Sequence, residues 1–268
     1  ILASIIRGLG NTYIPSKAIV IGSLCQIILS YVFTFGIYDS FKFGILGPAI
    51  SIVICHIIMM AYLFYYLIFK QSILKVKFHK FSNLIFIDIM KVGGLGLLNS
   101  ITIALTVGVM TGYIGNFGPN ALAGYGIGAR LELILTPIIF GIGAALTASV
   151  SINFGSKQFA RARKIAFTGG IVCFLIIGLI GLFINLFPQF LYQNFSSNPD
   201  VIKYCLKYIL IVTPFYCLFG FGQAIYFSSQ GTGKMIKPIL VGILRFSCVV
   251  LFGYLAVSRN LSIDYVLY

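Results

Sequence analysis

The sequence predicts an all-α membrane protein, a polytopic bundle of helices. Three observations lead to this prediction: 59% of the residues are hydrophobic, only 9% are charged, and long uncharged stretches alternate with turn signals. Soluble globular domains have about 25% charged residues, so the composition nearly excludes a soluble enzyme. The net charge is +14. Because acidic residues are few and the apolar runs are long, we assign this charge to loops that face anionic lipid, not to nucleic-acid binding.

Seven stretches reach the length of roughly 20 apolar residues that a helix needs to cross a hydrocarbon core of about 30 Å. In chain order they are Ser16 to Ile37, Gly44 to Phe69, Val92 to Gly115, Ala121 to Asn153, Ile165 to Phe187, Tyr204 to Ser228 and Pro238 to Ser258. Turn signals such as Gly118-Pro119 fall between these stretches. We therefore expect seven complete transmembrane helices.

The distribution of Lys and Arg predicts the orientation. Most of the 19 basic residues lie before the first span and after the second, fourth and sixth. Positive residues near helix ends resist translocation, so these connections should be cytoplasmic. The longest of them, residues 70–91, contains Lys70, Lys75, Lys77, Lys80 and Lys91. We expect this basic linker to separate two membrane lobes.

Two turns with the spacing GxGxxxxP precede the first and the seventh span. They contain Gly8, Gly10 and Pro15 in the first copy and Gly231, Gly233 and Pro238 in the second. An even number of spans separates the copies, so both cross the membrane in the same direction, as in parallel repeats related by an axis along the membrane normal. The repeat unit is then six helices, and the intact protein should have twelve in two lobes.

This repeat predicts the domain organisation. Residues 1–69 would be the last two helices of the N-terminal lobe, and residues 70–91 the cytoplasmic linker. Residues 92–268 would be five helices of the C-terminal lobe, whose last helix is missing. We therefore expect the chain to be a fragment that lacks both natural ends.

The fourth span combines small residues with a proline. Gly124 and Gly128, and likewise Gly141 and Ala145, are four residues apart, a spacing that favours close helix approach. Pro137 removes one backbone hydrogen bond and should loosen the helix near its middle.

Glu132 is the one carboxylate well inside an apolar stretch. If it is buried, it could exchange a proton or hold a cation, and we name it as the candidate ion-coupling residue. Alternatively it is a structural charge, because a span of ordinary length counted back from Asn153 places it near the outer surface. The sequence alone slightly favours the structural interpretation.

Several other polar side chains in or beside the spans are candidates to line a cavity: Asn99, Thr102, Tyr125, Arg130, Asn153 and Gln223. Each could instead hydrogen-bond between helices. Arg245, about two turns into the seventh span, is expected to reach the cytoplasmic interface. No HExxH, GxSxG or paired carboxylates occur, and the six cysteines lie singly. We therefore predict no catalytic residues, no metal site and no enzyme activity.

The fourth span and the segment after it resemble a known family. The run from Ala121 to Arg130, its continuation through Pro137 to Gly155, and Ala160-Arg161-Ala162 resemble the eighth helix and following loop of the multidrug and toxic compound extrusion (MATE) family. The two glycine turns resemble those before its fifth and eleventh helices. The resemblance implies two six-helix lobes around a V-shaped central cavity.

The resemblance also implies export of cationic or aromatic organic compounds by antiport with protons or sodium ions. The expected partners are small organic substrates and membrane lipid, without nucleic acid or a cofactor beyond the coupling ion. The expected location is the cell (inner) membrane, as a monomer. Several members carry acidic residues in the seventh and tenth helices, but the corresponding spans here contain none. The choice between H⁺ and Na⁺ stays open.

Two alternatives remain. A flippase for lipid-linked precursors, from the same broad superfamily, would need a strongly basic cavity to bind pyrophosphate. A seven-helix receptor would bind and signal without transport, but the repeat argues against it.

Cysteines introduced into both glycine turns and the basic linker of a cysteine-free version of the whole protein test the orientation. A membrane-impermeant maleimide should label none of them in intact cells and all of them after permeabilisation, because all three segments are predicted to be cytoplasmic. Labelling of the linker from outside, or of only one glycine turn, would contradict the predicted topology.

Overall fold

The computed structural model describes residues 1–36, 42–70, 81–192, 195–259 and 261–267. The chain divides into two compact units, Ile1–Phe81 and Ser82–Tyr268. The described residues form helices and turns, with no strand among them. Seven helical segments of this part of the chain are long and apolar enough to cross a membrane, which confirms the predicted all-α class and number of spans.

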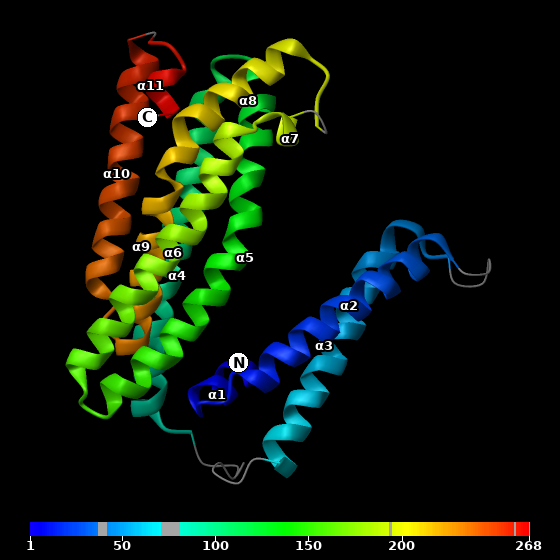
Figure 1. The fold of residues 1–268 in the computed structure, drawn as a ribbon, viewed down its shortest axis with the longest axis vertical. Coiled ribbons are helices and arrows are strands. Elements are labelled where there is room, and N and C mark those ends of the chain that lie inside the picture. The colour runs from blue at the N-terminus through cyan, green and yellow to red at the C-terminus, as the bar shows by residue number, and fades with distance from the viewer. Residues whose placement is uncertain (37–41, 71–80, 193–194, 260, 268) are drawn as a thin grey trace. The chain divides into compact units, whose positions relative to one another are not determined.

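Unit 1 is built around two long helices that pack along each other (Figure 1). Its elements are α1 (Leu2–Gly8), α2 (Tyr13–Phe35), the 3₁₀ turn η2 (Gly44–Leu46), α3 (Gly47–Tyr65) and the π-helical segment η3 (Tyr66–Lys70). Gly47 lies against the α2 backbone: a Cβ atom there would be 2.6 Å from the carbonyl carbon of Phe33. A side chain at this position would separate the two helices.

Unit 2 contains five further membrane-spanning segments. They are α4 (Asn83–Gly115), α5 (Pro119–Gly155), α6 (Phe159–Leu186), α8 (Pro199–Val212) with η4 (Thr213–Phe215) and α9 (Tyr216–Thr232), and α10 (Ile236–Ser258). Two short helices, α7 (Gln189–Tyr192) and α11 (Asp264–Leu267), lie at one end of the unit (Figure 1). That end also holds the start of α5 and the end of α10, and the predicted topology makes it the outer end.

Helix α5 is the centre of unit 2, because it packs against α6, α8 and α9. Ile127, Leu131, Leu135 and Ile139 recur every four residues, so they lie on one face of the helix. All four are buried in the main core cluster, together with Cys173, Ile177, Cys205 and Ile209 of the neighbouring helices. The other long helix pair of the unit is α4 and α10.

Small residues set the spacing between α5 and its neighbours. Gly124 lies against the α8 backbone, where an added Cβ would be 2.7 Å from the carbonyl oxygen of Val201. Gly128 and Gly143 each face an aromatic ring, that of Tyr208 and that of Phe227. The prediction of close approach therefore holds for Gly124 and Gly128. It is wrong for Gly141, which has no neighbouring atom within 4 Å of an added Cβ. Gly143 takes that role, because it is on the face of α5 that packs against α9.

The two predicted glycine turns share their local geometry. Gly10 has a φ angle of 87° and Gly233 one of 71°. In both copies the next helix begins three residues after this glycine, at Tyr13 and at Ile236. Pro15 and Pro238 then fall in the first helical turn, where the backbone N–H groups have no acceptor within the helix. The copies differ upstream, since Gly8 ends α1 whereas Gly231 lies within α9.

The structure differs from the predicted spans in two places, at the sixth span and at the start of the third. The sixth span is broken by the 3₁₀ turn that contains Pro214, because proline cannot continue the hydrogen bonding of an α-helix. Proline does not end every helix: α5 is continuous through Pro137, which is compatible with the predicted loss of one hydrogen bond there. Helix α4 begins at Asn83, so residues 83–91 of the predicted linker are helical; residues 71–80 lie outside the described part of the chain.

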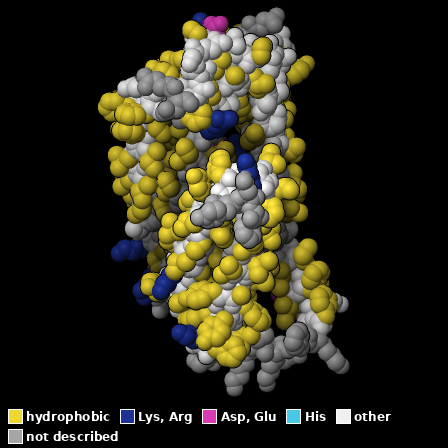
Figure 2. Space-filling view, turned by 90° about the vertical axis from the view of Figure 1, so that its right-hand side faces the viewer, with side chains coloured by type: hydrophobic (Ala, Val, Ile, Leu, Met, Phe, Trp, Pro, Cys, Tyr) yellow, Lys and Arg dark blue, Asp and Glu magenta, His cyan; other side chains and the backbone are white. Residues whose placement is uncertain are grey.

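The surfaces of the helices are strongly apolar, as lipid contact requires. Large hydrophobic side chains are exposed along every long helix. Figure 2 shows one face on which hydrophobic side chains dominate and Lys and Arg occur in small groups. Contact of these hydrophobic side chains with water instead of lipid would be unfavourable in free energy.

The contact between α5 and α8 predicts a difference between two neighbouring glycines. Gly124→Ala should lower the stability by about 1–3 kcal/mol, because its methyl group would push against the α8 backbone. Gly126→Ala is the matched control, since an added Cβ there meets no atom within 4 Å. It should leave stability unchanged or raise it by up to about 1 kcal/mol. Thermal unfolding of the purified whole protein measures both, and equal effects would contradict the close contact.

Candidate functional site

A cavity of about 830 Å³ lies within unit 2. Side chains of α4, α5, α8, α9, α10 and α11 line it. Its volume is within the range of roughly 300–1,000 Å³ that small-molecule sites occupy. The polar residues of its wall include Asn99, Glu132, Gln223, Gln230 and Arg245.

Glu132 is held in this wall by a tyrosine from α8. The Tyr208 hydroxyl donates a hydrogen bond of 2.9 Å to Oε1 of Glu132. Gly128 makes this contact possible: it lies one turn before Glu132, and a Cβ atom there would be 2.3 Å from the Tyr208 ring. Gly128 therefore leaves room for the Tyr208 ring, and Glu132, four residues later, accepts the hydrogen bond from the Tyr208 hydroxyl.

Two more tyrosines extend this arrangement. The hydroxyl groups of Tyr208 and Tyr216 are 3.4 Å apart. The ring of Tyr125 packs edge-on against the Tyr208 ring, with centroids 5.6 Å apart. Tyr208 is buried, whereas Glu132 is half-buried and lines the cavity. The carboxylate can therefore meet a ligand on one side while the tyrosine holds it on the other.

Aromatic rings form another part of the wall. Phe140 and Phe227 pack edge to face with ring centroids 5.0 Å apart, and Tyr226 packs against Phe227 at 5.7 Å. All three line the cavity. Rings of this kind offer apolar area and faces on which a planar ligand can stack.

The structure places three of the six predicted cavity-lining residues in this wall, Asn99, Tyr125 and Gln223, and also the coupling candidate Glu132. Asn99 lies beside α10, with its Oδ1 atom 3.4 Å from the position of a Cβ at Gly242. Glu132 is thus part of a cavity inside the bundle, which supports the functional interpretation that the sequence alone ranked second.

Three predicted residues lie outside this cavity. Thr102 is buried and donates to the Leu98 carbonyl of its own helix, 2.8 Å away. Asn153, near the other end of α5, donates to the Ser149 carbonyl at 2.8 Å. Arg130 is exposed, and its guanidinium lies 5.1 Å from the ring centroid of Phe195. Each of the three therefore has a local partner outside the cavity.

Several wall residues were not predicted from the sequence. Arg245 was expected at the cytoplasmic interface but lines the cavity, as do Thr136 and Tyr208. For Tyr208 a signal existed, because a glycine one turn before an intramembrane carboxylate leaves room for a large partner. Among the described residues no three His, Cys, Asp or Glu side chains lie close enough to hold a metal ion.

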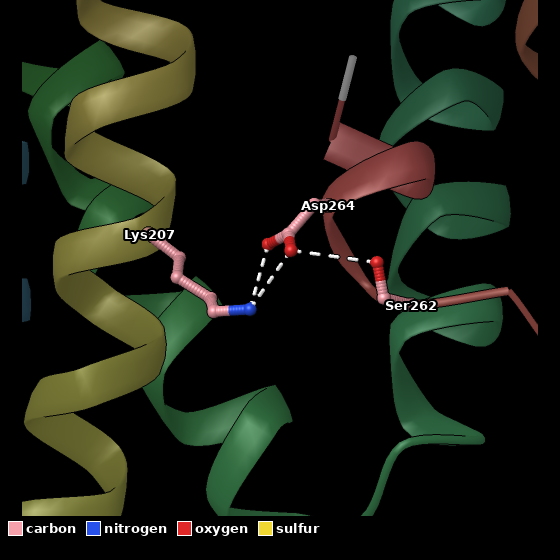
Figure 3. Close-up of polar contacts among 3 residues, drawn as sticks. All are labelled: Lys207, Ser262 and Asp264. Carbon is pink, nitrogen blue, oxygen red and sulfur yellow. Dashed lines mark hydrogen bonds and ion pairs between the residues drawn. The ribbon is translucent and has the colours of Figure 1, made fainter.

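An ion pair joins α8 to α11 near one end of unit 2 (Figure 3). Nζ of Lys207 on α8 is 2.8 Å from Oδ1 of Asp264 on α11. The Ser262 hydroxyl lies 3.4 Å from the other carboxylate oxygen. Leu267 at the end of α11 lines the cavity, so this ion pair holds a wall element in place.

A double-mutant cycle tests the contact between Glu132 and Tyr208. Glu132→Ala, which removes the acceptor, and Tyr208→Phe should each lower the stability of the purified protein by about 1–2 kcal/mol, with a coupling energy of about 0.5–1.5 kcal/mol between them. Tyr226→Phe is the matched control, because Tyr226 lines the same cavity without a hydrogen bond to Glu132 in the structure. Its cycle with Glu132→Ala should be additive. Additivity in both cycles would show that the hydrogen bond between Tyr208 and Glu132 does not form.

Sequence comparison matches the chain to one family model and to proteins named for multidrug resistance. The MatE family model matches residues 82–255. The chain is 21% identical over 243 residues to the probable multidrug resistance protein YoeA of Bacillus subtilis, covering 89% of this chain and 52% of the relative. It is 23% identical over 245 residues to the probable multidrug resistance protein NorM of Thermotoga maritima, covering 90% and 52%.

Solved structures share the fold. A MOP superfamily transporter from Pyrococcus furiosus superposes with a TM-score of 0.88 at 21% identity, over 98% of this chain and 59% of that one. The chain spans about half the length of the curated relatives it matches. The resemblance predicted from the sequence is confirmed by the family model: the chain belongs to the MatE family, the multidrug and toxic compound extrusion transporters.

Proposed function

We propose that the whole protein exports organic compounds across the cell (inner) membrane in exchange for inward movement of protons or sodium ions, and that Glu132 binds the coupling ion in the second lobe. The observation that supports this is the position of Glu132. Its carboxylate lines a large aromatic cavity inside a membrane-spanning bundle and is held by the Tyr208 hydroxyl. Ionisable residues in such places face cavities and pathways because lipid contact is too unfavourable.

The coupling follows from the charge of Glu132. An ionised carboxylate attracts an organic cation, whereas a carboxylate neutralised by a proton or by Na⁺ does not. Ion and substrate therefore compete for one site, so the binding of each weakens the binding of the other. Ion entry from outside would promote substrate release there, and loss of the ion inside would prepare the cavity for the next substrate.

The cavity also provides the other properties that the proposed substrates need. The rings of Phe140, Tyr226 and Phe227 offer apolar and stacking contacts to aromatic compounds. Arg245 is the single Lys or Arg among the described lining residues, so the wall lacks the strong positive charge that a pyrophosphate group would need. This favours multidrug export over flipping of a lipid-linked precursor.

The proposal includes the organisation of the whole protein. Residues 1–69 end the first lobe, the second lobe begins with α4 at Asn83, and the segment between them connects the lobes in the cytoplasm. The protein acts as a monomer in contact with substrate and lipid, without nucleic acid, an enzymatic step or a cofactor beyond the coupling ion.

Dye efflux from cells that express the whole protein tests the role of Glu132. Glu132→Gln should lower the initial rate of gradient-driven efflux at least about tenfold, because a neutral amide cannot exchange an ion. Asp200→Asn is the matched control, since Asp200 is exposed in the first turn of α8 and outside the cavity. Loss of efflux with a protonophore or on removal of Na⁺ identifies the ion. An unchanged rate in Glu132→Gln would refute the proposed role.

A further inference from the structure

The cavity of unit 2 contains a cation that the proposed function does not use. Arg245 lines the wall, and no carboxylate of the described residues lies within ion-pair distance of it. It lies about 14 Å along α10 from the start of the helix, at a rise of 1.5 Å per residue. A charged side chain at such a depth is stable where a partner or a wet cavity receives it.

The position of Arg245 on α10 shows that it faces the cavity. Gly242, Arg245 and Val249 follow at intervals of three and four residues, so they lie on one face of the helix. Val249 lines the cavity, and Asn99 of α4 approaches Gly242. Asn99 therefore lies beside the face of α10 that carries Arg245, about one turn toward the start of the helix, and Arg245 is itself exposed.

Glu132 and Arg245 lie at similar depth. Along the helix axis, at 1.5 Å per residue, Glu132 lies about 20 Å from the start of α5. Arg245 lies about 20 Å from the end of α10. These two helix ends lie at the same end of unit 2, because Ala121 and Ala256 belong to one buried cluster. The two charges form no ion pair with each other. The cavity therefore presents a negative and a positive group separately, together with aromatic rings.

This arrangement is complementary to a particular kind of molecule. A guanidinium binds a carboxylate with two parallel hydrogen bonds, and the amide of a neighbouring Asn99 can add another. A cationic group on the same molecule would be attracted by Glu132. The planar body would contact the rings of Phe140, Tyr226 and Phe227.

We propose that Arg245 is the residue that binds the carboxylate of aromatic zwitterions, and that such compounds are preferred substrates of this cavity. The inference rests on the proposed export function and narrows its substrate class. It assigns a second charged contact to the cavity, opposite in sign to Glu132 and independent of ion coupling.

Two dyes that differ in one group test the inference. Rhodamine 110 carries a free carboxylate, and rhodamine 123 is its methyl ester. With the purified whole protein, Arg245→Gln should weaken binding of rhodamine 110 about ten- to a hundredfold, because charge-assisted hydrogen bonds are lost. Binding of rhodamine 123 should stay within about twofold. Arg245→Lys should retain part of the preference, since it keeps the charge but loses the two-point geometry.

Lys237→Gln is the matched control on the same helix, because Lys237 is exposed in the first turn of α10 and outside the cavity. It should change neither affinity. Fluorescence anisotropy measures binding, and efflux from cells measures transport of the same two dyes. Retained binding of rhodamine 123 shows that a variant is folded.

The outcomes separate this inference from the proposed function. Selective loss of rhodamine 110 in Arg245→Gln supports the inference. Equal loss of both dyes in Arg245→Gln and Arg245→Lys, or no loss of either, overturns it while leaving export in place. Efflux of rhodamine 123 but not rhodamine 110 by the unaltered protein overturns it as well. Failure of the unaltered protein to export either dye removes the proposed function and the inference with it.

Discussion

The close approach of α5 to its neighbours is the constraint on which the rest of unit 2 depends. Gly124 lets α5 touch the α8 backbone, and Gly128 and Gly143 receive the rings of Tyr208 and Phe227. Between helices in lipid, packing replaces the hydrophobic effect as the main source of association, so such contacts carry much of the stability. The same contacts position the site, since the ring that fills the space at Gly128 brings its hydroxyl to Glu132.

Several polar groups within the spans of this chain have hydrogen-bond partners or face a cavity, as the absence of water in the hydrocarbon core of a bilayer requires. Backbone groups are satisfied within the long helices, and the break at Thr213–Phe215 packs against α6, with Thr213 buried and Pro214 and Phe215 exposed. The hydroxyl of Thr213, which is buried, accepts a hydrogen bond of 3.1 Å from Asn185 on α6. Charges deep in the spans face a cavity, as with Glu132 and Arg245, and the others lie near helix ends. A wall of this composition suits ligands that carry both charge and aromatic area.

Much of the fold could be predicted because the bilayer acts on local properties. Span length and apolar composition are readable in a single stretch, which is why all seven spans were found. The break at Pro214 was missed because its neighbours continue the apolar run, and α11 because a helix of this length has no apolar period. Gly141 was preferred to Gly143 because spacing alone does not reveal which side of α5 faces α9.

Less of the candidate site than of the fold could be predicted from the sequence. Glu132 stood out as a lone carboxylate, but whether it faced lipid, the interface or a cavity depends on helix rotation, which no local pattern specifies. Tyr208 and Arg245 join Glu132 from α8 and α10, and only the packing of distant segments brings them together. Thr102 and Asn153 illustrate the converse, since polar residues in spans often bond to their own helix.

The central claim is that ion and substrate compete for Glu132. Equilibrium binding of an organic cation to the purified whole protein, measured across a series of pH values and again across Na⁺ concentrations, tests it most directly. The account predicts that one of the two ions weakens binding progressively, and that Glu132→Gln abolishes this dependence. Affinity that is independent of both ions in the unaltered protein would contradict the account.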